Sequence, residues 1–151
     1  TCALPISKIA AIVESSSEPV FVFAITMENH GPLHLEKVAP TDVADLYAAA
    51  PPPGCDDLTI YLRHLRNADR MIGALRHNLS RSTRPASLCW FGDHVPSMPR
   101  VYDTLGAPAG PTAFALWSTR ETRRTEPVPL AAHQLAVEWL RAVGLMGDIS
   151  A

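Results

Sequence analysis

The sequence lacks the features that mark several large classes of protein. Its 151 residues contain no apolar run that approaches the roughly 18 needed to cross a membrane as a helix. The first residues have neither the basic nor the apolar region of a signal peptide, although a longer parent can carry both. The formal net charge is −2 at pH 7, which gives no basic footprint for nucleic acid. We therefore expect no nucleic-acid partner.

Cysteine is also scarce, and the arrangement of the few cysteines excludes two kinds of site. Cys2, Cys55 and Cys89 are odd in number and show no CxxC spacing, so they form neither a disulfide framework nor a zinc knuckle. They leave the redox compartment undecided. The GxSxG nucleophile elbow and the GxxxxGKS/T phosphate loop are missing as well. A hydrolytic or transfer reaction would therefore need its nucleophile from elsewhere.

What the sequence does contain is the composition of one soluble globular domain. Apolar residues make up 47% and charged residues 19% of the chain, and the length is sufficient to bury a core. The 14 prolines cluster in "PPPG" at 51–54 and "LGAPAGP" at 105–111. Proline fixes a backbone angle and removes a donor, so both stretches are predicted to be loops.

Hydrophobic periodicity predicts an alternation of helices and strands. The strongest helical pattern covers 55–81, where apolar residues recur every three or four positions from Leu58 to Leu75. "PVFVFAIT" at 19–26 is a continuous apolar run, which predicts a strand buried on both faces. The other expected elements are a helix at 7–17, strands at 86–91 and 111–118, and a helix at 129–145. This order predicts a layered α/β fold with a largely parallel sheet.

Polar side chains follow two of the predicted strands. Glu28, Asn29 and His30 come after the first, and Asp93 and His94 come after the strand at 86–91. Ligands in open α/β sheets collect beyond the carboxyl ends of the strands. If the two strands are parallel neighbours, both clusters lie at one edge, and we expect a common site there.

Asp93 and His94 are the candidate metal ligands. A carboxylate oxygen and an imidazole nitrogen suit zinc or manganese. Adjacent residues in a strand point to opposite faces, so both can reach one ion only where the backbone leaves the strand. Gly92 and Pro96 supply that departure. The alternative is that Asp93 forms a turn and His94 is merely exposed.

His30 is the candidate for contact with an anionic substrate. It either aims a donor at an anionic oxygen or hydrogen-bonds a carbonyl as an ordinary loop residue. Glu28 and Asn29 could be ligands, but such residues more often satisfy the loop backbone. We expect solvation for His34, and structural roles for His64 on the polar side of its helix, for His77 and for His133, whereas the role of Asp69 stays open.

Three blocks of the sequence together resemble a known family. "FVFAITMENHGP", "YLRHLRNADRMIGAL" and "LCWFGDHVP" are similar to the C-terminal half of the sulfatase-like part of the alkaline phosphatase superfamily. Within it, the likeness is greatest to the lipoteichoic acid synthase and phosphoglycerol or phosphoethanolamine transferase group of bacterial envelope enzymes. The similarity extends from Ile9 to Trp117, with the blocks in the same order and spacing.

The resemblance implies a three-layer α/β/α sandwich of the alkaline-phosphatase type, of which this chain is the C-terminal portion. It implies a divalent metal, Mn²⁺ or Zn²⁺, with Asp93 and His94 as ligands and the remaining ligands upstream of this chain. His30 would contact the phosphate or sulfate group of the substrate, and Asp69 would play a supporting part.

The family's nucleophile, a threonine or a modified cysteine or serine, belongs to an N-terminal block that this sequence does not show. We therefore expect 7–151 to be the C-terminal part of a catalytic domain, without a nucleophile of its own. Residues 1–6, "TCALPI", equal the in-frame translation of a widely used sequencing adaptor. We expect them to be an assembly artefact; the alternative is an authentic N-terminus.

The resemblance also implies a function. A phosphoglycerol or phosphoethanolamine head group would move from a phospholipid donor to an envelope glycan or lipid acceptor, through a covalent phospho-enzyme. The parent would sit in the inner membrane through an N-terminal part, with its catalytic domain facing the periplasm or cell exterior. Two alternatives stay open: a sulfatase or phosphodiesterase of the same fold that uses water as acceptor, and a non-catalytic α/β binding domain.

Overall fold

The structure of the chain is a computed structural model that describes residues 3–120 and 129–147. These residues form two compact units. The first unit runs to Leu75 and includes Val95–Gly110. The second comprises Arg76–His94 and the described residues from Pro111 onward.

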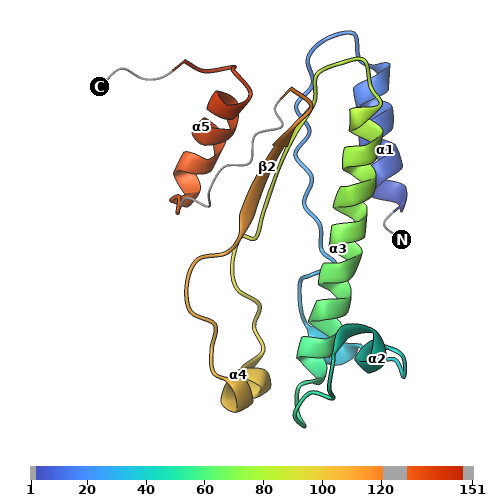
Figure 1. The fold of residues 1–151 in the computed structure, drawn as a ribbon, viewed down its shortest axis with the longest axis vertical. Helices are drawn as coiled ribbons and strands as arrows, with labels where there is room; N and C mark the ends of the chain where they lie inside the picture. The colour runs from blue at the N-terminus through green and yellow to red at the C-terminus, as the bar shows by residue number, and fades with distance from the viewer. Residues whose placement is uncertain (1–2, 121–128, 148–151) are drawn as a thin grey trace. The chain divides into compact units, whose positions relative to one another are not determined.

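The first unit contains most of the long helix α3 (Asp56–Ser80), labelled in Figure 1. Asp56 and Asp57 lie in its first turn, where carboxylates interact favourably with the exposed backbone amides. The helix predicted at 55–81 is thereby confirmed. The other elements of this unit are α1 (Ala3–Ser15), the 3-10 helix η1 (Leu33–Leu35), α2 (Asp42–Leu46) and α4 (Pro99–Leu105).

The core of the first unit joins elements that are far apart in the sequence. Leu33 of η1, Ile60 of α3 and Val101 of α4 are buried together, along with Met98 just before α4. Ile60 retains 1% of its surface. Burying a side chain of this size contributes about 1.5–3 kcal/mol, so packing against the apolar face of α3 stabilises the position of η1.

The second unit contains a two-stranded sheet and the last helix. β1 (Ser87–Phe91) pairs with β2 (Phe114–Ser118), with Ser87 opposite Ser118 and Phe91 opposite Phe114. In α5 (Ala132–Ala142), the indole nitrogen of Trp139 donates a hydrogen bond to Ser87 Oγ over 3.1 Å. The predicted strands at 86–91 and 111–118 and the predicted last helix are confirmed.

The prediction of a parallel sheet is wrong for these two strands, because β1 and β2 run antiparallel. A parallel pair needs a connection that carries the chain back to the start of the sheet, usually through a helix packed on one face. The connection here does contain a helix, α4, but α4 belongs to the first unit. The chain leaves β1 and enters β2 at the same end of the sheet, where Phe91 lies opposite Phe114.

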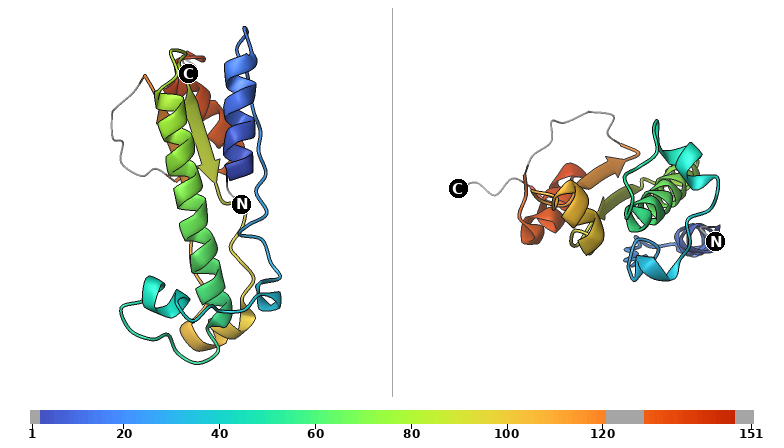
Figure 2. Two further views of the ribbon diagram at one scale, coloured as in Figure 1. Left: turned by 90° about the vertical axis from the view of Figure 1, so that its right-hand side faces the viewer. Right: turned by 90° about the horizontal axis from the view of Figure 1, so that it is seen from below.

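The predicted strand at 19–26 is also wrong. This segment has no strand assignment, and Figure 2 draws it without an arrow. Phe21, Phe23 and Ile25 are 73%, 67% and 75% exposed. A run that is apolar on both sides forms a strand only when sheet neighbours and covering layers are available, and the two strands of residues 3–120 and 129–147 pair with each other.

The described residues are therefore helices with one two-stranded antiparallel sheet, consistent with part of an α/β fold. No helix within 3–120 and 129–147 is both long enough and apolar enough to span a membrane.

Candidate functional site

Asp93 and His94 lie directly after β1, where the chain leaves the sheet. Asp93 Oδ1 accepts a hydrogen bond from the backbone N–H of His94 over 3.0 Å, and Asp93 Oδ2 lies 3.7 Å from His94 Nε2. Their side chains are 80% and 61% exposed, respectively. Asp93 thus shapes a turn, and the same turn brings a carboxylate and an imidazole to one point at the surface.

The turn begins at Gly92, which is hydrogen-bonded to the two residues just before β2. The backbone N–H of Gly92 donates to the carbonyl of Ala113 over 3.1 Å, and the hydroxyl of Thr112 donates to the carbonyl of Gly92. A Cβ added at Gly92 would lie 3.4 Å from Thr112 Cβ. These contacts anchor the backbone immediately before Asp93, so the turn that carries both metal-ligand candidates is attached to the sheet of the second unit.

The donor set fits a divalent cation in kind. One carboxylate oxygen and one imidazole nitrogen are ligands that zinc and manganese accept, and Asp93 and His94 present one of each on the same side of the turn. A protein site usually needs at least one further ligand. In the part of the chain that the structure describes, no group of three or more His, Cys, Asp or Glu residues could hold a metal ion.

His30 lies in the first unit, in the loop between α1 and η1. Its backbone N–H donates to the carbonyl of Met27 over 3.1 Å, which closes a tight turn. Its Nδ1 lies 2.7 Å from the carbonyl oxygen of Gly31. A carbonyl can only accept, so Nδ1 carries the proton of this hydrogen bond and the ring is oriented by its own loop. The His30 side chain is exposed.

The structure thus brings Asp93 and His94 together, and it places His30 in the other compact unit. The common site of the three residues remains a prediction. Three further candidates are exposed: His34 on η1, Asp69 on α3 and His133 on α5. The exposure of His34 agrees with its predicted solvation, whereas the roles of Asp69 and His133 stay predictions.

Glu28 has a definite partner that the sequence did not indicate. Asn67 Nδ2 of α3 donates a hydrogen bond to Glu28 Oε1 over 2.6 Å. Glu28 therefore connects the loop of His30 to the long helix. The neighbouring Asn29 has a buried side-chain nitrogen without a hydrogen-bond partner among the described residues.

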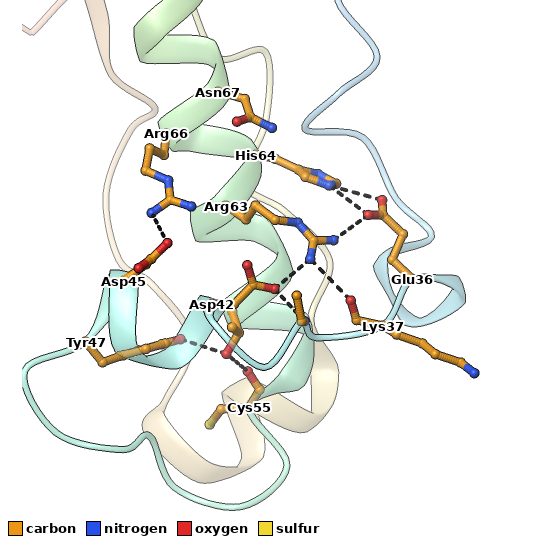
Figure 3. Close-up of polar contacts among 12 residues, drawn as sticks. Glu36, Lys37, Asp42, Asp45, Tyr47, Cys55, Arg63, His64, Arg66 and Asn67 are labelled. Carbon is orange, nitrogen blue, oxygen red and sulfur yellow. Dashed lines mark hydrogen bonds and ion pairs between the residues drawn. The ribbon is translucent and has the colours of Figure 1, made fainter. Parts of the chain in front are cut away.

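A second connection to α3 lies just after η1 and one helical turn earlier on α3. Glu36, the residue that follows η1, lies 2.7 Å from Arg63 Nη2 and 3.0 Å from His64 Nε2. Arg63 Nη1 also contacts Asp42 Oδ2 at 2.6 Å and donates to the carbonyl of Lys37 over 3.2 Å. Figure 3 shows Arg63 between the carboxylates of Glu36 and Asp42, so this guanidinium links the two acidic residues to α3.

The side of α3 that carries His64 is polar in its contacts, as predicted, but it is covered rather than open to solvent. His64 retains only 6% of its surface, because the segment that carries Glu36 lies over it (Figure 3). Its Nδ1 is buried without a hydrogen-bond partner in the described residues. A helical wheel shows which side of a helix is polar, but it does not show which loop covers that side.

The arginine lowers the pKa values of both carboxyl groups that it contacts. For Asp42, the hydrogen bond from the backbone N–H of Ala39 is the main cause, and Arg63 adds to it; together they outweigh burial and lower the pKa below 3.8. For Glu36, burial would raise the pKa, but hydrogen bonds from His64 and Arg63 outweigh it and lower the pKa below 4.5. Both groups are therefore held as carboxylates near neutral pH.

The lowered pKa of Asp42 predicts a loss of stability in acid. Because the folded-state pKa lies below the unfolded value near 3.8, the unfolded chain binds protons first as the pH falls. The contribution of Asp42 is present above that value and is lost below it. We expect the urea concentration at half-unfolding to decrease as the pH is lowered below about 4. Asp42→Asn should make this concentration depend less on pH. Asp103→Asn, which removes an exposed carboxylate, is the control; equal flattening by both variants would contradict the assignment.

Sequence reasoning missed Arg63, Asn67, Glu36 and Asp42 as a connected set. One signal was available: Arg63 and Asn67 are four residues apart in a strongly periodic helix, so they share one face. Their partners lie 21 to 39 positions away, and no local pattern indicates such pairing.

Comparison with known proteins gives three findings. A profile of the family described as Sulfatase matches residues 6–143. A protein of Rhizobium meliloti (strain 1021), named "Putative cyclic beta-1,2-glucan modification protein", is 28% identical over 96 residues. That alignment covers 64% of this chain and only 15% of the relative, so the chain corresponds to a small part of the relative's length. No solved structure matches.

Proposed function

The chain belongs to the Sulfatase family, within the alkaline phosphatase superfamily, and from this membership we propose that it is part of the catalytic domain of a metal-dependent phosphotransferase. The match over residues 6–143 carries the proposal, since it covers nearly all of the described residues. The family comprises hydrolases and transferases. In the complete domain, we propose, the two units contribute to a three-layer α/β/α sandwich.

The donor we propose is a phospholipid with a phosphoglycerol or phosphoethanolamine head group, and the acceptor is an envelope glycan or lipid. The name of the rhizobial relative supports a glycan acceptor, because it specifies modification of a cyclic β-1,2-glucan. The parent would be held at the inner membrane by a part outside this chain, with the catalytic domain facing the periplasm or cell exterior.

We assign Asp93 and His94 as metal ligands and His30 as the contact to the substrate's phosphate oxygens. A bound Mn²⁺ or Zn²⁺ ion would neutralise charge on the reacting phosphate and lower the pKa of a nucleophilic hydroxyl. Asp93 supplies anionic charge to the ion, and His94 supplies a neutral nitrogen. The carbonyl of Gly31 accepts the Nδ1 proton of His30, which orients the ring edge that would meet the substrate.

The reaction we propose has two steps. A threonine hydroxyl, contributed by sequence upstream of this chain, attacks the phosphorus and displaces diacylglycerol. An acceptor hydroxyl then attacks the phospho-threonine, which restores the threonine and completes the transfer. His30 would hold the non-bridging oxygens in both steps, since both pass through a charge-rich transition state.

The experiment uses the protein encoded by the complete open reading frame that contains this chain. It is incubated with Mn²⁺, phosphatidylglycerol labelled in its head group, and cyclic β-1,2-glucan. Labelled glucan together with diacylglycerol is the expected product. Residues 1–151 alone should give none, because no nucleophile is assigned within them. Release of free glycerol phosphate without labelled glucan, or cleavage of an aryl sulfate alone, would refute the transferase.

A hydrolase of the same fold is the second candidate, and the description of the matching family as Sulfatase favours it. It shares the roles of Asp93, His94 and His30 and differs only in using water as acceptor. The product analysis above therefore separates the two, whereas substitutions at the metal ligands do not.

Metal binding by Asp93 and His94 can be measured on residues 1–151. On titration with Mn²⁺, paramagnetic broadening should reach the ring signals of His94 before those of His133, because the 3.7 Å pair offers two ligands at one point. We expect Asp93→Ala to raise the Mn²⁺ concentration for half-broadening about tenfold or more. Asp103→Ala should leave it unchanged. Broadening of His133 at the same concentration as His94 would count against the site.

A further inference from the structure

We infer that Asn67 is a positioning residue for His30, acting through Glu28, within a clamp formed by Arg63, His64 and Asn67 on one face of α3. The inference rests on the proposed role of His30 and goes beyond it. It assigns a function to a helix face that is remote in sequence from the loop it holds. Asn67 itself touches neither substrate nor metal in this assignment.

The segment 28–36, which contains His30 and η1 and is called the loop below, is attached to α3 at both of its ends. At its start, Asn67 Nδ2 donates to Glu28 Oε1 over 2.6 Å. At its end, Glu36 lies 2.7 Å from Arg63 Nη2 and 3.0 Å from His64 Nε2. Asn67 follows Arg63 by four positions, so both lie on the same helix face.

A third attachment lies between these two. Leu33 of η1 is 5% exposed and packs in the core with Ile60, one turn before Arg63 and His64 on α3. The helix therefore contacts the loop at three successive turns, in the order of Ile60, the Arg63–His64 pair and Asn67. A rigid helix fixes the spacing of the three contacts, and with it the course of the loop.

His30 sits inside the section that the Glu28 contact controls. The hydrogen bond from His30 N–H to the carbonyl of Met27 closes a turn whose two inner residues are Glu28 and Asn29. A carboxylate anchored at Glu28 thus fixes the turn from within. The hydrogen bond between His30 Nδ1 and the carbonyl of Gly31 then transfers that orientation to the ring.

The contact is suited to positioning because it lies away from the core. Glu28 and Asn67 are half-buried, whereas Leu33 and Ile60 carry the packing. Loss of the contact should therefore loosen the turn while α3 and the core persist. This separates Asn67 from Arg63, whose loss would leave the buried Asp42 without its cation.

The test compares Asn67→Ala with the exchanged pair Glu28→Gln/Asn67→Asp, in which the glutamine donates and the aspartate accepts. On residues 1–151, long-range ¹H–¹⁵N spectra report the Nδ1–H tautomer of His30, and hydrogen exchange reports the turn at 28–31. We expect Asn67→Ala to abolish the single-tautomer signature and speed exchange about tenfold or more, with the melting temperature within a few degrees. The exchanged pair should restore both. Asn78→Ala, at an exposed position of α3, is the control.

In the complete reading frame, Asn67→Ala should lower kcat/KM about ten- to a hundredfold, and the exchanged pair should recover most of it. An unchanged His30 spectrum in Asn67→Ala, or failure of the exchanged pair to restore it, would overturn the positioning role. His30→Ala distinguishes the two proposals. Full activity of His30→Ala, alongside a restored His30 spectrum in the exchanged pair, would refute the substrate contact while the clamp stands.

Discussion

Asp93→Ala in the complete open reading frame is expected to lower turnover about a thousandfold. A metal ion that stabilises developing charge contributes several kcal/mol to the transition state, and each 1.36 kcal/mol corresponds to roughly a factor of ten. Asp93 would supply the anionic ligand of the pair with His94. Its loss should remove the ion as well as the rate, so bound manganese, measured by elemental analysis, should fall in parallel.

Two controls make this result specific. Asp103→Ala removes an exposed carboxylate of α4 and should leave turnover within about twofold, as expected for a surface substitution. His94→Ala should resemble Asp93→Ala, because both act through one ion. Turnover above a tenth of the wild-type value in Asp93→Ala, with manganese retained, would exclude Asp93 as a ligand.

Arg63→Ala should destabilise the chain by about 3 kcal/mol, a typical cost of removing one partner of a buried ion pair. Asp42 keeps only 4% of its side-chain surface exposed, and Arg63 Nη1 lies 2.6 Å from it. Without the guanidinium, a carboxylate would remain buried with its hydrogen bond from Ala39 as the principal compensation. Urea unfolding followed by circular dichroism at 222 nm measures the difference.

Arg66→Ala is the matched control on the same helix. Arg66 lies 3.4 Å from Asp45, whose side chain is 51% exposed, and exposed pairs contribute about 0–1 kcal/mol. A second variant, Arg63→Lys, should recover only part of the loss, because an ammonium group lacks the fork that reaches Asp42 and Glu36 together. Equal midpoints for Arg63→Ala and Arg66→Ala would show that the Asp42 pair is not stabilising.

Elements with a strong local signal were predictable from the sequence. The helix at 55–81 is observed as Asp56–Ser80, and the strand at 86–91 as Ser87–Phe91. In both, the information lies within the segment itself: a repeated three- and four-residue spacing, or a short apolar run bounded by turn residues. The turn at Asp93 was likewise predictable from Gly92 and Pro96 on either side of it.

Pairing was not predictable from the same signals. An apolar strand looks alike whether its neighbour is parallel or antiparallel, and the antiparallel register of β1 and β2 depends on a connection that passes through the other unit. The run at 19–26 has the residues of a strand, but hydrogen bonding in a sheet needs neighbours that a local pattern cannot supply.

The candidate site divides in the same way. The proximity of Asp93 and His94 was predictable because they are adjacent in sequence and lie in one turn; their role as metal ligands stays a prediction. The attachment of Glu28 to Asn67 spans 39 positions, so it depends on how the loop folds over α3. Helical spacing placed Arg63 and Asn67 on a common face, but the loop that covers this face became evident only in three dimensions.

The exposed apolar run at 20–26 has the composition of an aggregation-prone segment. "VFVFAIT" contains no charge, proline or glycine, and Phe21, Phe23 and Ile25 are largely exposed. Segments of this length and composition stack between molecules into cross-β fibrils when nothing covers them. We therefore expect residues 1–151 to aggregate at high concentration unless another part of the parent covers this run, so solution measurements on them call for dilute samples.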